Sequence, residues 1–289
     1  MYPEAFSYHA PSTVEEALAL LERHGDDAKL LAGGHSLLPA MKLRLSGPTH
    51  IIDMKHLRGS LDYIRDEGDD VAIGALTTHR SLERSELLRG KLPVLAETAG
   101  CIGDMQVRNL GTLGGSVAHA DPAGDLPAAV LALDAVLVAQ GSGGTRTIAA
   151  GEFFHGFFET ALEAGEILIE LRIPTLAAGS GSSYQKFFHP ASGYAVCGAA
   201  AVITPDASGN VASCRVALTG VSEGAYRATA VEEALVGKPF SEELAAAAAE
   251  HAADGIEPLE DYFADATYRG HLAKTFVKRA LLTAWERSG

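Results

Sequence analysis

The feature that most constrains the fold is a pair of adjacent glycines that occurs twice among hydroxyl-bearing neighbours. The first pair, in Ala32-Gly33-Gly34-His35-Ser36, follows the segment Lys29-Leu30-Leu31-Ala32, which predicts a strand. The second lies in Thr112-Leu113-Gly114-Gly115-Ser116. Glycines let a backbone turn sharply and leave its N–H groups open to an anion such as a phosphate. Two such turns would suit a pyrophosphate; the alternatives are an ordinary strand-to-helix turn and a long surface loop.

Familiar nucleotide-binding and catalytic motifs are missing. There is no G-x-G-x-x-G after a strand and no P-loop, which argues against a Rossmann dehydrogenase and a P-loop ATPase. H-E-x-x-H and G-x-S-x-G are also absent, and the 11 histidines show no zinc-ligand spacing. Cys101, Cys197 and Cys214 are too widely separated to hold an iron–sulfur cluster. Redox chemistry on this chain would therefore need an organic cofactor or a partner's metal.

The charge balance limits the partners. Lys+Arg 23 against Asp+Glu 37 give a net charge of -14, which disfavours nucleic acids and anionic membrane surfaces. The N-terminal residues lack the pattern of a secretory signal, and the longest apolar stretch, residues 126–139, is too short to span a bilayer. We expect a cytoplasmic protein with reduced thiols and no transmembrane segment.

In the first part of the chain, strands and helices alternate. Strands are expected at 50–54, 71–75, 135–139 and 167–173, with a capping box at residues 12–15 opening the first helix. Further helices are expected at 35–45, 81–88 and 92–101. Residues 102–126 are rich in glycine and predict a long loop before a helix that runs to Leu133.

A domain boundary is expected at residues 175–183, where Gly179 and Gly181 lie among small residues. Beyond it, three strands (184–188, 195–203 and 211–219) precede three helices (229–235, 242–253 and 268–287). A Thr229/Glu232 capping box is expected to open the first of these helices. Strands followed by helices predict an α+β unit.

The two glycine segments, with Asp125 beyond the second and Gln106-Val107-Arg108-Asn109 before it, resemble the paired FAD-binding motifs of the flavoprotein subunits of molybdenum hydroxylases. This family, the xanthine dehydrogenase family, includes the medium subunit of aerobic carbon monoxide dehydrogenase. The carbon monoxide dehydrogenase medium-subunit type is the most similar. The resemblance runs nearly end to end and includes Phe6-Ser7-Tyr8-His9-Ala10-Pro11.

The resemblance implies an α+β fold. Residues 1–177 would form a two-lobed FAD-binding domain of the vanillyl-alcohol-oxidase (PCMH) type, with lobes at about 1–55 and 56–177. Residues 178–289 would form a small α+β C-terminal domain of three strands and helices. FAD would lie in the cleft between them, its pyrophosphate on amides of residues 33–36 and 112–116. The residues implied to contact it are Ala32, Gly33, Gly34, His35, Ser36, Ile102, Thr112, Gly114, Gly115, Ser116, Asp125, Leu168, Lys186 and Tyr194.

Individual roles follow from the same resemblance. Asp125 matches a flavin-contacting aspartate, Leu168 a backbone or packing contact, and Tyr194 a tyrosine packed against the isoalloxazine. Ile102 stands where relatives have an aromatic residue. Lys186 matches a flavin-proximal lysine, so Lys186→Ala is expected to lower the flavin potential. From the residues alone, a solvated lysine on a strand is an equal alternative, and Arg108 pairs with a phosphate or faces solvent.

The implied function is electron transfer. Substrate would be oxidised at a molybdopterin site on a large partner, and [2Fe-2S] clusters on a small partner would carry electrons to the FAD of this chain, which passes them to an external acceptor. The implied assembly is a cytoplasmic dimer of heterotrimers, peripheral to the inner membrane face through the complex. No catalytic or metal-binding residue is assigned to this chain. The alternatives are a stand-alone FAD-dependent oxidoreductase of the same superfold and a subunit that has lost its flavin.

Overall fold

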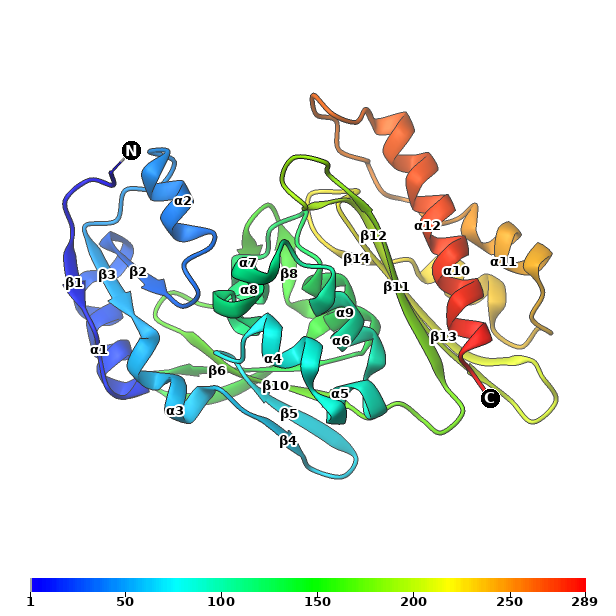
Figure 1. The fold of residues 1–289 in the computed structure, drawn as a ribbon, viewed down its shortest axis with the longest axis horizontal. Helices are drawn as coiled ribbons and strands as arrows, with labels where there is room; N and C mark the ends of the chain where they lie inside the picture. Colours follow the sequence, from blue (N-terminus) through cyan, green and yellow to red (C-terminus); the bar gives the residue numbers. More distant parts are fainter. Residues whose placement is uncertain (1) are drawn as a thin grey trace.

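The computed structural model describes residues 2–289, which form three parts that lie side by side in Figure 1. The N-terminal part is built on a parallel sheet with strand order β1-β3-β2. Ala17 and Leu18 of its first helix pack against Ile52 of the sheet in a small core. The elements are β1 (Ser7–His9), α1 (Val14–His24), β2 (Ala28–Leu31), α2 (Leu37–Lys42), β3 (His50–Asp53) and α3 (Arg58–Leu61), with 3-10 turns at Gly25–Asp27 and Met54–Leu57.

The middle part is an antiparallel sheet of order β4-β5-β10-β6-β7, with a group of short helices on one side of it (Figure 1). The strands are β4 (Ile64–Asp66), β5 (Asp70–Gly74), β6 (Val136–Gly141), β7 (Gly144–Ala149) and β10 (Ile167–Pro174), beside a hairpin of β8 (Phe154–Gly156) and β9 (Glu159–Thr160). The helices are α4 (His79–Arg84), α5 (Glu86–Lys91), α6 (Pro93–Gly100), α7 (Met105–Leu110), α8 (Leu113–His119) and α9 (Leu126–Ala132). All of α9 is buried, which explains its uninterrupted apolar sequence.

The C-terminal part is an antiparallel sheet of order β11-β12-β13-β14. Its elements are β11 (Gly181–Phe188), β12 (Ala195–Pro205), β13 (Val211–Thr219), β14 (Tyr226–Arg227), α10 (Thr229–Leu235), α11 (Glu242–Ala249) and α12 (Ala266–Glu286). Strand β12 serves two cores, because successive side chains point to opposite faces. Ala200 and Val202 belong to the core of the middle part, whereas Ala199 and Ala201 face the core formed with the C-terminal helices.

Several local predictions were wrong. Residues 102–126 are not one loop, because Asp104 and Thr112 cap the helices α7 and α8 within it. The first helix begins after Thr13, one residue later than the expected box. The predicted helix 81–88 is broken at Ser85, which caps α5. The C-terminal sheet has a fourth, short strand, β14, beyond the three expected.

The expected Thr229/Glu232 capping box is also absent. Ala228 occupies the N-cap position, where no side chain caps the helix. The Glu232 carboxylate instead accepts from the Val216 N–H at 2.8 Å and from Arg227 Nε at 2.7 Å. The Glu232 carboxylate therefore bonds to groups of β13 and β14, and not to the start of its own helix as the spacing predicted.

Candidate functional site

The first glycine pair forms the turn between β2 and α2. Gly34 has a φ of +77°, a left-handed conformation that glycine adopts without steric strain. Within residues 2–289, the backbone N–H groups of residues 33–37 have no hydrogen-bond acceptor. These residues are partly or largely exposed. Consecutive free N–H donors on an accessible turn form an anion site of the expected kind.

The second glycine pair begins helix α8, where the Thr112 hydroxyl accepts from the Gly115 N–H at 3.1 Å. The neighbouring amides donate to carbonyls of the protein: Leu113 to Thr77 (2.9 Å), Gly114 to Ala75 (2.8 Å) and Ser116 to Thr112 (3.0 Å). The expectation of free amides in both turns therefore fails for residues 113–116. In this turn, the geometry leaves only the Thr112 N–H without a protein acceptor among the described residues 2–289.

The two turns touch each other. A Cβ on Gly33 would lie 2.4 Å from the Leu110 carbonyl oxygen, and one on Gly115 would lie 3.5 Å from the Ala32 Cβ. A Cβ on Gly114 would likewise meet the neighbouring backbone at 2.8 Å. Close packing of backbone on backbone therefore requires glycine at positions 33 and 114. The fold brings the two motifs together, as expected.

A buried ion pair joins β11 to the start of α9. Lys186 Nζ lies 2.8 Å from Asp125 Oδ2, and the two side chains are 1% and 5% exposed. The Tyr184 hydroxyl donates to Asp125 Oδ1 at 2.5 Å. Tyr184 and Lys186 are two residues apart on one strand, so both point to the same face. Both carboxylate oxygens of Asp125 are thus engaged by protein groups.

Lys186 is saturated by its surroundings. Besides Asp125, its Nζ donates to the Cys101 carbonyl at 3.1 Å and to the Gly193 carbonyl at 2.7 Å. An ammonium carries three hydrogens, so these three acceptors use all of them. The alternative of a solvated lysine is wrong. The side chain instead ties together the end of α6, the start of α9 and the loop between β11 and β12.

Burial shifts the acid–base properties of this group. Burial raises the pKa of Asp125, while Lys186 and the Tyr184 hydroxyl oppose the rise. Burial and the adjacent Asp125 carboxylate raise the pKa of Tyr184 well above its usual range. Tyr184 therefore stays a hydrogen-bond donor across physiological pH. The three side chains form a closed network inside the protein.

Three other expected residues differ in accessibility. Tyr194 is 40% exposed in the loop between β11 and β12. Burial raises its pKa and the Ser36 hydroxyl opposes the rise, which places the phenol beside the first turn. Leu168 is a buried core residue of β10. Ile102 is partly buried, and its carbonyl accepts from Arg108 at 2.9 Å.

Some residues that shape the site were not anticipated. His79 is buried against the second turn, where a Cβ on Gly111 would lie 2.7 Å from its ring. Burial, with the nearby His35 and Arg108, lowers the pKa of His79 to about 4. No motif marks this histidine, whereas the spacing of Tyr184 and Lys186 on a strand was a usable signal.

The alternative in which Arg108 simply faces solvent is wrong. Its Nε donates to Glu83 Oε2 at 3.1 Å, and its Nη1 donates to the Ile102 carbonyl. The side chain is only 15% exposed. Arg108 therefore fixes the turn between α6 and α7, and α7 in turn leads into the second glycine motif.

Two family models divide the chain between them. The model described as the FAD binding domain in molybdopterin dehydrogenase matches residues 4–176, and that described as the CO dehydrogenase flavoprotein C-terminal domain matches residues 182–284. The chain belongs to the family of FAD-binding subunits of molybdopterin dehydrogenases. Its cofactor is FAD, and its role is that of an electron-transferring oxidoreductase subunit in a molybdenum hydroxylase complex.

Relatives of this flavoprotein match it along its whole length. The carbon monoxide dehydrogenase medium chain of Hydrogenophaga pseudoflava is 46% identical over 99% of both chains. The 6-hydroxypseudooxynicotine dehydrogenase complex subunit alpha of Paenarthrobacter nicotinovorans is 38% identical over 100% of this chain and 97% of its own.

Solved structures of the family confirm the expected two-lobed PCMH-type fold with an α+β C-terminal part. Carbon monoxide dehydrogenase from Hydrogenophaga pseudoflava lacking the Mo-pyranopterin moiety superposes with a TM-score of 0.97, at 47% identity and 100% coverage of both chains. Quinoline 2-oxidoreductase from Pseudomonas putida 86 superposes with a TM-score of 0.92, at 34% identity and 99% coverage of both. Among the described residues 2–289, no helix has the length and apolar character needed to cross a membrane.

Proposed function

We propose that this flavoprotein holds the FAD pyrophosphate on the first glycine turn. The supporting observation is the run of unpaired N–H groups at residues 33–37. Oriented amide donors favour an anion, so this chain's residues fit a diphosphate group there. Ala32 to Ser36 would carry the phosphate contacts, with His35 exposed at the turn's surface.

The second turn has a supporting part in this proposal. Its amides at residues 113–116 are engaged within the protein, so Gly114, Gly115 and Ser116 shape the wall of the site, and the Thr112 N–H is the donor left for the ligand. Packing of Gly33 on Leu110 holds the first turn against this wall. The second turn thus fixes the position of the first.

When bound, FAD supplies the conversion between electrons received singly and electrons released in pairs. The chain's residues position it. Tyr194 lies beside the first turn and provides a half-exposed aromatic surface toward the cofactor. Lys186 donates to the Gly193 carbonyl, one residue before Tyr194, and therefore acts as a positioning residue for that ring. Asp125, Leu168 and Ile102 would support the site from within the fold.

The assembly extends the proposal beyond this chain. We assign residues 1–177 to an FAD-binding domain and 178–289 to a C-terminal flavoprotein domain. The partners would be a small iron–sulfur subunit and a large molybdopterin subunit in a dimer of heterotrimers, in the cytoplasm and peripheral to the membrane through the complex. Full-length similarity to chains named medium chain and complex subunit alpha supports this assembly over a stand-alone oxidoreductase.

An absorption spectrum of the purified chain, recorded after adding FAD and removing the excess, tests the phosphate assignment. Gly34→Asp places a carboxylate on the free-amide turn and is expected to weaken FAD binding about tenfold or more, which is about 1.4 kcal/mol. Gly68→Asp is the matched control, because Gly68 also has a positive φ (+87°) and a Cβ there meets nothing within 4 Å. Flavin retained equally by both variants would contradict the assignment. If the wild-type chain retains none alone, the same comparison is made with the partner subunits co-expressed.

A further inference from the structure

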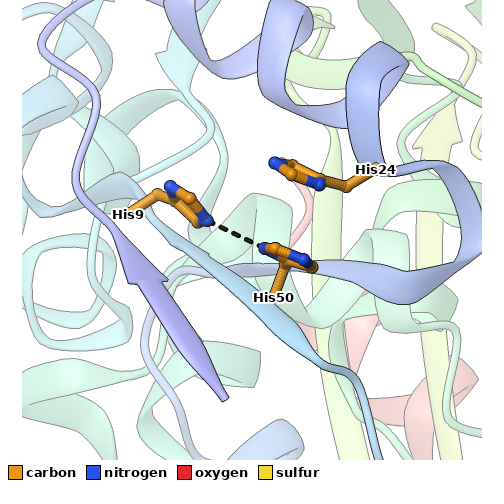
Figure 2. Close-up of side chains that lie close together, drawn as sticks. All are labelled: His9, His24 and His50. Carbon is orange, nitrogen blue, oxygen red and sulfur yellow. Dashed lines mark hydrogen bonds between the residues drawn. The ribbon is translucent and has the colours of Figure 1, made fainter.

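Three histidines that are distant in sequence meet in the N-terminal part, apart from the residues assigned to the flavin (Figure 2). One ring nitrogen from each of His9, His24 and His50 lies within 4.8 Å of the other two. His9 Nε2 and His50 Nδ1 are 3.0 Å apart and share a hydrogen bond. The His24 ring stacks on the His50 ring with centroids 3.7 Å apart. All three residues are partly buried.

The fold fixes this arrangement. In the parallel pairing of β1 with β3, Ser7 lies opposite His50 and His9 opposite Ile52, so both histidines project from one face of the sheet. Ile52 on that face packs against α1. His24 is the last residue of α1, at the helix end above the two strand histidines. Local spacing in the sequence therefore gave no signal of the cluster.

The surroundings favour a cation over a purely structural stack. The C-terminal end of a helix carries partial negative charge, and His24 occupies that end of α1. Among the described residues 2–289, the rings of the cluster bond only to each other, in contrast to His251, which lies 2.6 Å from Asp254. The charged neighbours of His24 are Arg23 and Asp27, of opposite sign. The cluster thus contains several imidazole nitrogens and no carboxylate that binds one of them.

Access and chemistry define the class of ligand. A surface hollow of about 350 Å³, whose lining includes His9 and Arg23, borders the cluster. Neutral imidazoles suit Zn²⁺, Cu²⁺ and Ni²⁺, whereas Mg²⁺ and Ca²⁺ prefer oxygen ligands. The final side-chain torsion of histidine is soft, so a modest ring rotation aims the stacked His24 nitrogen at a shared ion.

We propose that His9, His24 and His50 form a binding site for a divalent transition-metal ion, Zn²⁺ being the reference case, with water completing its coordination. Three histidines and one open position form a known zinc arrangement. The ion would join β1, α1 and β3, and would stabilise the N-terminal part independently of the flavin. Neither FAD binding nor electron transfer is needed for it.

Equilibrium dialysis of the purified flavoprotein against Zn²⁺ alone, followed by metal analysis, tests the site. His24→Gln removes one ligand without breaking the bond between His9 and His50, and His9→Gln/His50→Gln removes the other two. The matched control is His155→Gln/His271→Gln, because both of these histidines are exposed. The wild-type chain and the control are expected to bind one equivalent of Zn²⁺ that excess Mg²⁺ does not displace, and both cluster variants are expected to lose it.

Two readouts separate metal binding from folding. Far-UV circular dichroism and the flavin content of each variant report the fold and the flavin site, and both are expected to be unchanged in His24→Gln. Zn²⁺ is expected to raise the Tm of the wild-type chain and of the control, but not that of His24→Gln. Zn²⁺ binding that is absent from the wild-type chain, equal in all variants or displaced by Mg²⁺ would overturn the proposal.

Discussion

The two glycine turns look alike in sequence and are used differently in the structure. The turn at residues 33–37 keeps its amides free, whereas the turn at residues 113–116 has every amide paired within the protein. The difference lies in the available acceptors, because the carbonyls of Thr77 and Ala75 accept from Leu113 and Gly114, and Thr112 accepts from Gly115 and Ser116. A glycine pair therefore does not by itself define a ligand site. We therefore distinguish the first turn, whose free N–H groups can bind a ligand, from the second turn, which is closed by protein hydrogen bonds and supports the first.

The largest effect on stability is expected from the buried network of Asp125, Tyr184 and Lys186, which, like the second turn, is closed within the protein. Lys186→Met leaves Asp125 buried without its counter-ion, and breaking such a buried pair costs about 3–5 kcal/mol of unfolding free energy. Denaturant titration against Lys29→Met, an exposed lysine on β2, provides the measurement and its control. A loss below about 1 kcal/mol, the range of exposed ion pairs, would show that the buried network does not stabilise the fold.

His79, which is buried against the second turn, predicts that the free energy of unfolding depends on pH. Burial holds the pKa of His79 at about 4, whereas the unfolded chain has the ordinary value of 6.5. The unfolded state then binds more protons between these values, so stability rises with pH across this window and falls as the solution is acidified. One pKa unit corresponds to about 1.4 kcal/mol, so we expect protonation of His79 to lower the free energy of unfolding by about 3 kcal/mol between pH 6.5 and pH 4.

The contribution of His79 is measured as a difference between proteins. His79→Leu is expected to show a shallower loss of unfolding free energy over this window than the wild-type chain. His155→Gln, at an exposed position, should keep the wild-type slope. Parallel curves for the wild-type chain and His79→Leu would mean that the buried ring is not responsible.

Replacing one glycine of each turn by alanine is expected to have the smallest effects on stability, and it tests directly whether the two turns have different roles. Gly114→Ala forces a methyl group into neighbouring backbone and is expected to cost about 1–3 kcal/mol, with FAD affinity little changed in the folded fraction. Gly34→Ala is expected to cost about 1 kcal/mol for its left-handed φ and to weaken FAD binding as well. Gly68→Ala, with φ +87° and open space around it, controls for backbone strain. The Tm and the FAD affinity of the three variants are measured by thermal unfolding and FAD titration. Equal losses of FAD affinity in Gly34→Ala and Gly114→Ala would contradict the different roles of the two turns.

The fold was largely predictable because apolar runs and the two motifs are local signals. The short helices α7 and α8 were missed because their definition depends on caps at Asp104 and Thr112 within a glycine-rich stretch. The capping box predicted for Thr229 and Glu232 was wrong because of a tertiary contact: the Glu232 carboxylate accepts a hydrogen bond from the Val216 N–H and does not cap its own helix.

The candidate site was predictable in its motifs and not in its hydrogen bonds. Residues 32–36 and 112–116 were expected to lie together, and they touch. Which amides remain free depends on distant carbonyls such as those of Ala75 and Thr77, and no sequence spacing reveals these. Likewise, the burial of Lys186 depends on the Cys101 and Gly193 carbonyls, which are brought to it by other elements.

Strand β12 has a consequence for how this protein can be recombined. Two family models meet near residues 176–182, which suggests a natural place to exchange the C-terminal segment between relatives. Yet Tyr184, Ala200, Val202 and Ala217 belong to the core of the middle part, so a chimera joined there would build that core from both parents. Substitutions on the middle-facing side of β12 and on the helices it meets are therefore expected to covary in the family. The boundary that is clearest in sequence therefore separates residues that share one hydrophobic core. A chimera that keeps this core intact needs β12 and the middle part from the same parent.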